Sequence, residues 1–381
     1  METEEQQDLK LQTNKEKRSR RKHNSVFELP NKYLYILIAF IVFVIILINI
    51  LYFSSSKNDN TSINNPNKMR GIQDTQIFDQ NTLLKYKTEL NEFCNYNDKN
   101  ISSNYEDQIT LANVSLLSQI FKMYVYKNED IVSKEILTVE SWESEETSNL
   151  LTALLYYSAL YGLKPKDIYV LDIGSNIGWY SLFIAKYGYN ILSFEPSDLN
   201  NYILKKNYCL NKELNITFIK KGLYNNEKKC DFYKSKGNCG DGFVFCDKKG
   251  NLPSHLEKSE EVTLTKLENY IPFLSKHNLG LIKIDVEGAE EKVLEGGIQL
   301  LSKYHVPFIF LEFNPDSLKL HGTDPKKFLK MFHKYGYKFP SYNFFDNEFL
   351  SVDEILERTN KTYNLYIVYH RISKKYHSLN K

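Results

Sequence analysis

The chain has 381 residues, and its 49 Lys and Arg nearly balance 47 Asp and Glu, which leaves a formal net charge of +2 at pH 7. A charge this close to zero provides little attraction for a polyanion, so we predict no nucleic-acid partner. The length exceeds that of an average domain but suits an α/β fold with additional N-terminal segments.

The first predicted element is an uncharged apolar run at 33–53, long enough to cross a bilayer as one helix. A long polar stretch precedes this run and no obvious small-x-small cleavage site follows it, which favours a transmembrane signal anchor over a cleaved signal peptide. Basic residues cluster at 15–22 and therefore predict a cytosolic tail at 1–32. The same cluster would also suit a sorting signal or a lipid-headgroup contact.

This topology predicts a single-pass type II membrane protein of the endoplasmic reticulum or Golgi. Residues 54–79 are rich in Asn, Ser, Lys and Gly, which predicts a flexible stem, and 80–381 would form the lumenal domain with an N-terminal helical extension. Sequons are then usable, although Asn215 lies beside a predicted strand where a glycan fits poorly. The sequons begin at Asn60, Asn100, Asn113, Asn215 and Asn360.

The chain has 5 Cys, an odd number, and Cys230, Cys239 and Cys246 lie close together. Their spacing lacks a Cys-x-x-Cys pair and no His lies between them, so a structural zinc site is disfavoured. In a lumenal compartment a disulfide within this segment is the simpler interpretation, although the sequence does not choose the partners. One thiol would remain free or form an intermolecular bridge.

Apolar residues in the rest of the chain follow alternating strand and helix patterns. A helix is expected at 145–161, because its leucines recur at helical spacing. The alternation that follows predicts an α/β fold with a doubly wound, mostly parallel sheet. The expected strands are 168–172, 190–195, 216–220, 280–285 and 307–313, with helices near 177–187, 198–211 and 288–302.

The first of these strands leads into the most informative segment, Val170–Ser181, which reads Asp-x-Gly-x-Asn-x-Gly from Asp172 onward. Gly174 and Gly178 carry no Cβ, so a ligand can approach the backbone and the next helix can begin tight against the strand. The spacing differs from the Gly-x-Gly-x-x-Gly dinucleotide pattern. We therefore predict a nucleoside site that involves Asp172, Gly174, Asn176 and Gly178.

The neighbouring strand ends in a second acid, Glu195, which Pro196 follows. A carboxylate at this point of a doubly wound sheet typically binds ribose hydroxyls, so Glu195 is predicted to hold the same ligand. A single acid of this kind is as often an ordinary strand-end or N-cap residue. The occurrence of Asp172 and Glu195 on neighbouring strands favours the functional interpretation.

Together these motifs resemble the FkbM-type S-adenosylmethionine-dependent methyltransferases. The resemblance depends on 170–178, on Phe194–Pro196, and above all on Lys283–Glu290, which reads Lys-Ile-Asp-Val-Glu-Gly-Ala-Glu. Weaker matches at 262–267 and 310–313 extend it over about residues 120–340. Where the family often has a Leu-Asp pair, this chain has Leu267 followed by Glu268. We treat this as a tolerated difference.

The resemblance implies S-adenosylmethionine as the cofactor and a Rossmann-like methyltransferase sheet. It also implies that the segments 338–339 and 363–370 form the antiparallel hairpin that closes such a sheet. Trp142 and Glu143 resemble a Trp-Glu element of the family and would pack over the entrance to the cofactor site. For Asp241, within a segment rich in Gly and Asn, a lid loop that touches the cofactor or acceptor competes with a plain turn.

Further acids follow the later strands and would emerge at the same edge of the sheet as Asp172 and Glu195: Asp285, Glu287 and Glu312. Asp285 is the predicted catalytic base, while Glu287 is expected to act partly as a cap of the following helix. His321 is a second candidate base in a later loop, where a surface role is more common. Grouped carboxylates would equally suit a divalent cation, and the sequence leaves metal binding undecided.

The sequence as a whole predicts a methyltransferase that modifies a hydroxyl group, with a glycan in the secretory pathway as the expected acceptor. One alternative is a type II glycosyltransferase, because Asp285-Val-Glu287 loosely resembles the Asp-x-Asp motif that holds a metal and a nucleotide sugar. Another is a membrane-tethered binding module without turnover. The glycine motif favours the methyltransferase, since a metal-bound sugar nucleotide does not need it.

Overall fold

The computed structural model describes residues 78–97, 105–128, 130–246, 252–358 and 362–379. The chain divides into two compact units, 1–69 and 70–381, and all described residues lie in the second unit. Within these described ranges, no helix combines the length and the apolar character that a membrane crossing requires.

The predicted N-terminal segments lie outside the described residues. These are the cytosolic tail at 1–32, the transmembrane helix at 33–53 and nearly all of the stem at 54–79. The structure therefore leaves them as predictions.

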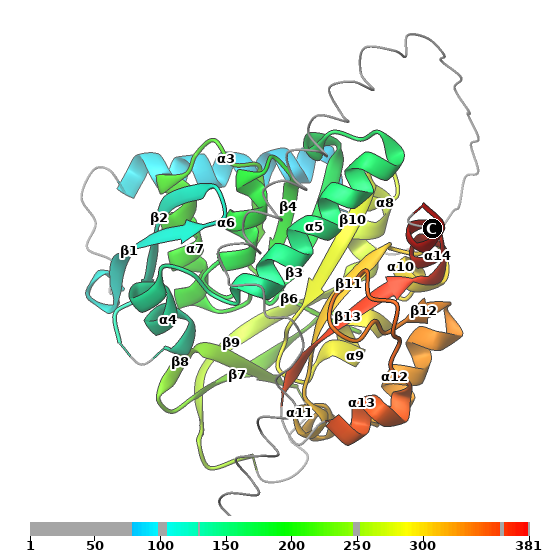
Figure 1. Cartoon of the computed structure of the whole chain (residues 1–381). Helices are drawn as coiled ribbons and strands as arrows, with labels where there is room; N and C mark the ends of the chain where they lie inside the picture. The colour runs from blue at the N-terminus through cyan, green and yellow to red at the C-terminus, as the bar shows by residue number, and fades with distance from the viewer. Residues whose placement is uncertain (1–77, 98–104, 129, 247–251, 359–361, 380–381) are drawn as a thin grey trace, which may run out of the picture. The chain divides into compact units, whose positions relative to one another are not determined.

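A seven-stranded sheet forms the centre of the second unit, in the order β12-β13-β11-β10-β3-β4-β5 (Figure 1). The strands from β11 to β5 are parallel, whereas β13 runs antiparallel to both β11 and β12. The predicted α/β sheet with an antiparallel C-terminal pair is confirmed. Its strands are β3 (Ile168–Ile173), β4 (Asn190–Phe194), β5 (Ile216–Ile219), β10 (Asn278–Ile284), β11 (Phe308–Phe313), β12 (Tyr337–Lys338) and β13 (Tyr363–Tyr369).

The central strands are apolar and almost fully buried, as expected for parallel strands that are covered on both faces. Every residue of β4 is buried. The predicted helix at 145–161 is confirmed as α5. The other helices after α5 (Ser144–Tyr161) include α6 (Trp179–Lys186), α7 (Asp198–Leu210), α8 (Ile271–Leu274), α11 (Pro315–Leu320), α12 (Pro325–Lys334), α13 (Val352–Arg358) and α14 (His370–Leu379).

The helix predicted at 288–302 is instead two short helices, α9 (Glu290–Glu295) and α10 (Gln299–Ser302). Gly296 and Gly297 separate them, and both lie against neighbouring chain. A Cβ on Gly296 would lie 2.1 Å from the backbone oxygen of Tyr224. A long regular helix was therefore the wrong prediction, because the periodic apolar pattern does not reveal this close approach.

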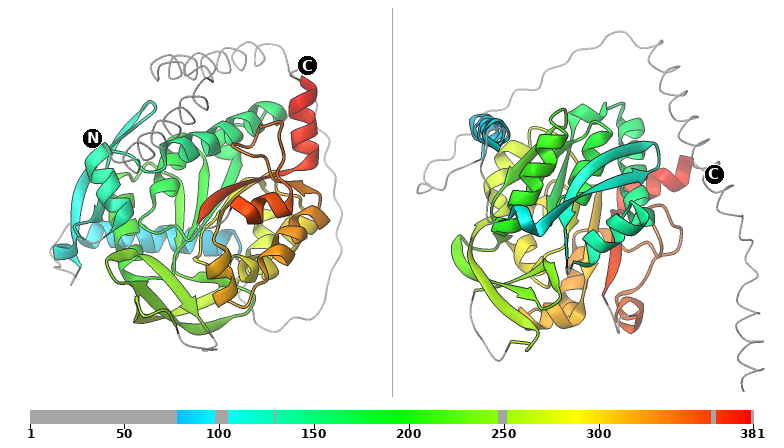
Figure 2. Two further views of the ribbon diagram at one scale, coloured as in Figure 1. Left: turned by 60° about the horizontal axis from the view of Figure 1, so that its bottom comes forward. Right: turned by 90° about the vertical axis from the view of Figure 1, so that its left-hand side faces the viewer.

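The predicted N-terminal helical extension is only partly helical. It contains α3 (Gln80–Asn97) and α4 (Ile131–Val139), but an antiparallel hairpin of β1 (Ile109–Leu116) and β2 (Gln119–Tyr126) lies between them. Figures 1 and 2 show this hairpin on the side of the domain away from α12 and α13.

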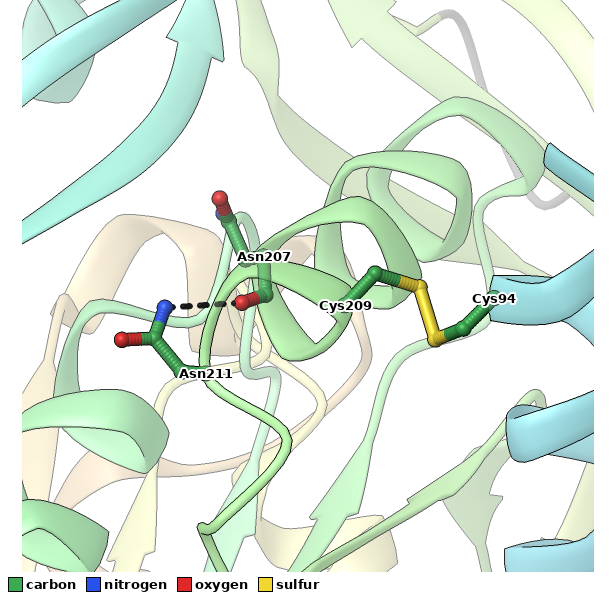
Figure 3. Close-up of a disulfide and its surroundings, with 4 residues drawn as sticks. All are labelled: Cys94, Asn207, Cys209 and Asn211. Carbon is green, nitrogen blue, oxygen red and sulfur yellow. Dashed lines mark hydrogen bonds between the residues drawn. A yellow bond between two sulfur atoms is a disulfide. The ribbon is translucent and has the colours of Figure 1, made fainter. Parts of the chain in front are cut away.

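A disulfide attaches the extension to the sheet layer, because Cys94 of α3 is bonded to Cys209 of α7 (Figure 3). On the same helix, the Nδ2 of Asn207 donates to the backbone oxygen of Tyr124 on β2, at 2.9 Å, and to that of Ile177, at 3.1 Å. Helix α7 thus connects the extension with the loop that follows β3.

A second sheet, which the sequence did not predict, joins β6 (Gly222–Tyr224), β9 (Leu256–Lys266), β7 (Lys228–Ser235) and β8 (Asn238–Phe245) in that order. A disulfide joins Cys230 of β7 to Cys246, which confirms the predicted disulfide within this segment. The side chain of Cys239 is outside what the structure describes. Figure 1 shows β7, β8 and β9 as a separate layer beside the central sheet.

Candidate functional site

A cavity of about 260 Å³ opens where β3, β4, β10 and β11 end, at the edge where doubly wound sheets bind ligands. Residues of β8 and of the segment before α5 complete its wall. Several residues predicted from the sequence meet here, namely Gly174, Asn176, Glu195, Asp241, Asp285, Glu287 and Glu312. Trp142 and Glu143, predicted to pack over the entrance, also line it. Asp172, Gly178 and His321 are not among its lining residues.

The glycine loop, residues 174–178, folds as its sequence requires. Gly174 has φ +75°, and a Cβ there would lie 1.7 Å from the backbone oxygen of Asp285. Gly178 has φ +93°, and a Cβ would lie 2.5 Å from a methyl group of Leu204 on α7. Asn176 also has positive φ, 49°, which Asn tolerates better than most residues. Gly174 therefore sets how closely two loops approach, and Gly178 how closely α6 approaches α7.

Glu195 holds the glycine loop from the tip of β4. Its Oε2 accepts a hydrogen bond from the backbone N–H of Asn176 at 3.0 Å, and its Oε1 accepts one from Ser197 at 2.9 Å. Burial raises the pKa of Glu195 to about 7, although these two N–H groups favour the ionised form. The carboxylate borders the cavity, so its remaining lone pairs are available to ligand hydroxyls.

Asp172 lies beneath the cavity rather than in its wall. The side chain is 2% exposed, its Oδ2 accepts from Ser181 Oγ at 2.6 Å, and its Oδ1 lies 3.8 Å from the Nζ of Lys283. Burial raises its pKa, while Lys283 and Ser181 act in the opposite direction. A direct contact of Asp172 with a cofactor stays a prediction.

The acid cluster, defined as Asp285, Glu287 and Glu312, also lines the cavity. Carboxylate oxygens of these residues lie within 4.8 Å of one another. Burial, and then the neighbouring charge of Asp285, raise the pKa of Glu287 and of Glu312 well above the usual value. Three converging carboxylates can accept hydrogen bonds from hydroxyl groups or hold a hard divalent cation through oxygen.

Glu290, not Glu287, supports the start of the helix after β10. The Oε1 of Glu290 accepts from the backbone N–H of Val286 at 3.2 Å and of Gly288 at 3.1 Å. Glu287 has positive φ, 53°, and its side chain lines the cavity. The expected capping role of Glu287 is thus wrong, which leaves its carboxylate free to act with the acid cluster.

His321 ends α11 and stacks on the ring of Phe245, with centroids 4.8 Å apart and planes 10° apart. Burial lowers its pKa to about 4, so it is neutral at physiological pH. His321 packs against Gly288, because a Cβ on Gly288 would come 2.8 Å from the imidazole Cδ2 of His321. This position does not bring it to the cavity wall.

Asp241 lies on strand β8, so neither a lid loop nor a turn describes it. The turn of the β7–β8 hairpin falls just before β8, and Asp241 follows it within the strand. Its Oδ1 accepts the backbone N–H of Ser235 at 2.9 Å. The second sheet thus brings Asp241 to the cavity.

The sequence missed several lining residues that come from distant parts of the chain. Tyr180 donates its hydroxyl to Glu143, which also accepts from the Nδ2 of Asn364 at 3.0 Å. Asp130 caps α4, where its Oδ2 accepts from the N–H of Ser133 at 2.7 Å. Asp130 could have been found from the sequence, because an acid just before a helix with Ser three positions later is a typical N-cap pattern. Nothing in the sequence marks Asn364.

The domain belongs by its fold to the Rossmann-like α/β class, in which nucleoside ligands bind at the carboxyl edge of the sheet. Three features place it there: the strand order, the reversed strand β13 and the cavity beside the glycine loop. Residues 172–339 match the family model described as the methyltransferase FkbM domain. This match confirms the resemblance inferred from the motifs.

The matched region runs from the end of β3 to β12. It includes the glycine loop, Glu195 and the acid cluster. The segment before α5 and strand β13, which also supply lining residues, lie beyond it.

Three of the solved structures that this chain matches are methyltransferases. The bifunctional kinase-methyltransferase WbdD is 13% identical over 59% of this chain and 39% of that chain, with a TM-score of 0.35. Precorrin-6y C5,15-methyltransferase from Geobacter metallireducens GS-15 is 12% identical over 63% of this chain and 92% of that chain, with a TM-score of 0.32. The plantazolicin methyltransferase BpumL, solved in complex with SAH, is 15% identical over 58% and 84%, with a TM-score of 0.29.

The similarity spans about two fifths of the length of WbdD, 39%. No curated protein matches this sequence at a significant level.

Proposed function

We propose that the protein is an S-adenosylmethionine-dependent O-methyltransferase that modifies a hydroxyl of an uncharged glycan in the secretory pathway. One observation carries the proposal: the glycine loop, Glu195 and the acid cluster line a single cavity. The glycine loop and Glu195 suit a nucleoside, and the acid cluster suits a hydroxyl that must lose a proton.

The residues present fit the cofactor. The cavity wall contains two side-chain oxygens that are buried and have no hydrogen-bond partner, Asp130 Oδ1 and Asn176 Oδ1. Such acceptors match the amine and hydroxyl donors of S-adenosylmethionine. Glu195 would bind its ribose hydroxyls, and the backbone of Gly174 leaves room for close approach. When bound, the cofactor supplies an electrophilic methyl group.

The acid cluster supplies the base. Asp285 has a half-buried carboxylate, with its side chain 36% exposed, and it lies beside two half-buried glutamates whose pKa is raised. Asp285 would accept the acceptor proton as it leaves in the transition state, because a carboxylate is too weak a base to ionise an alcohol beforehand. Glu287 and Glu312 would orient the acceptor through hydrogen bonds from its other hydroxyls.

The charge of the cavity favours an uncharged acceptor. Among the described residues that line it, seven are acidic, and Lys283 is the only basic one. An anionic group would meet mainly carboxyl groups here, and Lys283, already paired with Asp285, offers it no free positive partner. The acidic residues are Asp130, Glu143, Glu195, Asp241, Asp285, Glu287 and Glu312.

The proposed compartment has separate support. The run at 33–53 and the basic residues at 15–22 favour a type II anchor with the enzyme in the lumen of the endoplasmic reticulum or Golgi. The two disulfides, Cys94–Cys209 and Cys230–Cys246, suit an oxidising compartment.

A type II glycosyltransferase stays a second candidate because of the acid cluster, whose oxygens lie close enough together to hold a divalent cation. Such an enzyme would bind a nucleotide sugar through that cation. The glycine loop and Glu195 would then have no evident partner, which is why we favour methyl transfer. A binding module without turnover would bind the cofactor and transfer nothing.

Calorimetric titration of the full-length chain separates these functions. We expect S-adenosylmethionine to bind without added metal, and nucleotide sugars to give no heat with or without Mn²⁺. Binding of a nucleotide sugar that requires Mn²⁺, together with no binding of S-adenosylmethionine by the folded protein, would overturn the proposal. Transfer of labelled methyl groups to neutral glycans, but not to their sialylated or sulfated counterparts, would exclude the binding module and test the acceptor class.

A further inference from the structure

Lys283 is buried in the middle of the site, and none of the roles proposed above for the glycine loop, Glu195 or the acid cluster includes it. It lies on β10, next to β3, and is 4% exposed. Its Nζ donates to the backbone oxygen of Gly174 at 2.7 Å and to Asp285 Oδ2 at 3.0 Å. It also lies 3.8 Å from Asp172 Oδ1. The ammonium group thus donates two hydrogen bonds and lies within ion-pair distance of a third oxygen.

We propose that Lys283 is a positioning residue that ties the glycine loop to Asp285, so that cofactor binding and the direction of the catalytic carboxylate depend on one ammonium group. This inference rests on the proposed function. It gives Lys283 no contact with the reacting atoms. Its effect passes through Gly174 and Asp285.

The two loops already touch at the residues that Lys283 joins. The backbone N–H of Asp285 donates to the oxygen of Ile173 at 3.0 Å. A Cβ on Gly174 would clash with the backbone oxygen of Asp285. Because the two loops are in direct contact, a reorientation of the Gly174 peptide group also displaces Asp285.

Lys283 is charged and therefore is not itself a base. Burial alone would lower its pKa, but Asp285 and Asp172 outweigh burial and raise the pKa above the usual value. The ammonium also lies 5.7 Å from the ring centroid of Tyr180, another lining residue, within reach of a cation–π interaction. A protonated lysine at this place orients groups rather than moving protons.

A purely structural explanation would make Lys283 only the counter-ion of buried Asp172. The double variant Asp172→Asn/Lys283→Met distinguishes the two explanations, because it removes both buried charges. Lys283→Met alone leaves Asp172 buried without a cation, which is strongly destabilising. The double variant relieves that defect but still leaves the Gly174 oxygen and Asp285 without their donor.

The experiment measures affinity and stability of the full-length chain together. Both tryptophans of the chain, Trp142 and Trp179, line the cavity, so intrinsic fluorescence reports S-adenosylmethionine binding without an acceptor. Melting temperature is measured on the same samples. A matched control is Lys206→Met, because Lys206 also donates to a carboxylate at 3.0 Å, that of Glu106, and lies 4.9 Å from a tyrosine ring, but outside the cavity.

We expect the double variant to regain most of the melting temperature lost in Lys283→Met, while its dissociation constant for S-adenosylmethionine stays about tenfold above that of the wild type. Lys206→Met should bind like the wild type. If affinity returns together with stability, Lys283 is only a counter-ion and the inference is overturned.

The variant Lys283→Arg covers the case in which neither methionine variant folds. It keeps the charge that Asp172 needs, but a planar guanidinium does not reproduce the three directions of an ammonium. We expect weaker binding at a nearly unchanged melting temperature, and wild-type affinity in this variant would contradict the inference. Failure of the wild type to bind S-adenosylmethionine would overturn the proposed function as well, whereas normal wild-type binding with unaffected variants overturns the inference alone.

Discussion

Two glutamates near the site, Glu195 and Glu290, hold loops in the same way, although Glu195 lines the cavity and Glu290 does not. Each accepts two backbone N–H groups, and burial raises the pKa of each to about 7. The acid cluster beside Glu290 is different, because its carboxylates face one another and the raised pKa values of Glu287 and Glu312 come partly from that repulsion. Backbone N–H donors thus fix the side-chain geometry of Glu195 and Glu290. In the acid cluster, repulsion between like charges helps to raise the pKa of Glu287 and Glu312.

The largest expected effect is the loss of methyl transfer when Asp285 is replaced. Replacing it by Asn keeps the shape of the side chain but removes the base, so methyl transfer should fall about 10²–10⁴-fold. Cofactor affinity should change little. The measurement is transfer from labelled S-adenosylmethionine to neutral glycans, with Asp316→Asn, an exposed acid on α11, as the control. An unchanged rate would remove Asp285 from the mechanism.

The next effect is a pH dependence of stability through Glu290. Its folded pKa is raised from 4.5 to about 7, so its contribution is fully present below about pH 4.5 and is lost as the pH rises through 7. Glu290→Gln should therefore gain stability relative to the wild type between pH 5 and 8, by up to about 3 kcal/mol. The amide fits, because Oε1 accepts both N–H groups whereas Oε2 has no partner.

Unfolding in urea at several pH values measures this difference. Two parallel stability curves for wild type and Glu290→Gln would contradict the raised pKa. Glu291→Gln, on the same helix but partly exposed, is the control.

A smaller effect is expected at Glu195, where both oxygens accept backbone N–H groups. Glu195→Gln would point an amide N–H at one of these donors, and we expect affinity for S-adenosylmethionine to fall about tenfold. Tryptophan fluorescence measures it. Glu260→Gln is the matched control, since Glu260 also accepts a backbone N–H, that of Asp198, but outside the cavity. Equal affinities in the two variants would argue against a role of Glu195 in binding.

The smallest effect is expected at His321. Its pKa of about 4 keeps it neutral at pH 7, and it packs on Phe245 away from the cavity wall. His321→Phe preserves the aromatic stacking and should leave the transfer rate within about threefold of the wild type. A loss comparable to that of Asp285→Asn would instead make His321 a second base.

The sequence by itself determined the central sheet and the glycine loop. Both follow from short-range physics, because strand–helix alternation fixes a parallel sheet and positive-φ positions select Gly174 and Gly178. It also located most of the acids that line the cavity, since the carboxyl ends of parallel strands meet at one edge. Val170–Gly178 and Lys283–Glu290 were informative for this reason.

Only the tertiary structure decided which acids face the cavity and what supports them. Asp172 is buried beneath the wall, Glu290 rather than Glu287 holds the loop before α9, and the second sheet brings Asp241 to the site. These outcomes depend on contacts between residues far apart in the chain, such as Glu143 with Asn364. A local pattern can show that a carboxylate follows a strand. The direction of its side chain depends on how neighbouring loops pack and which backbone donors they leave free.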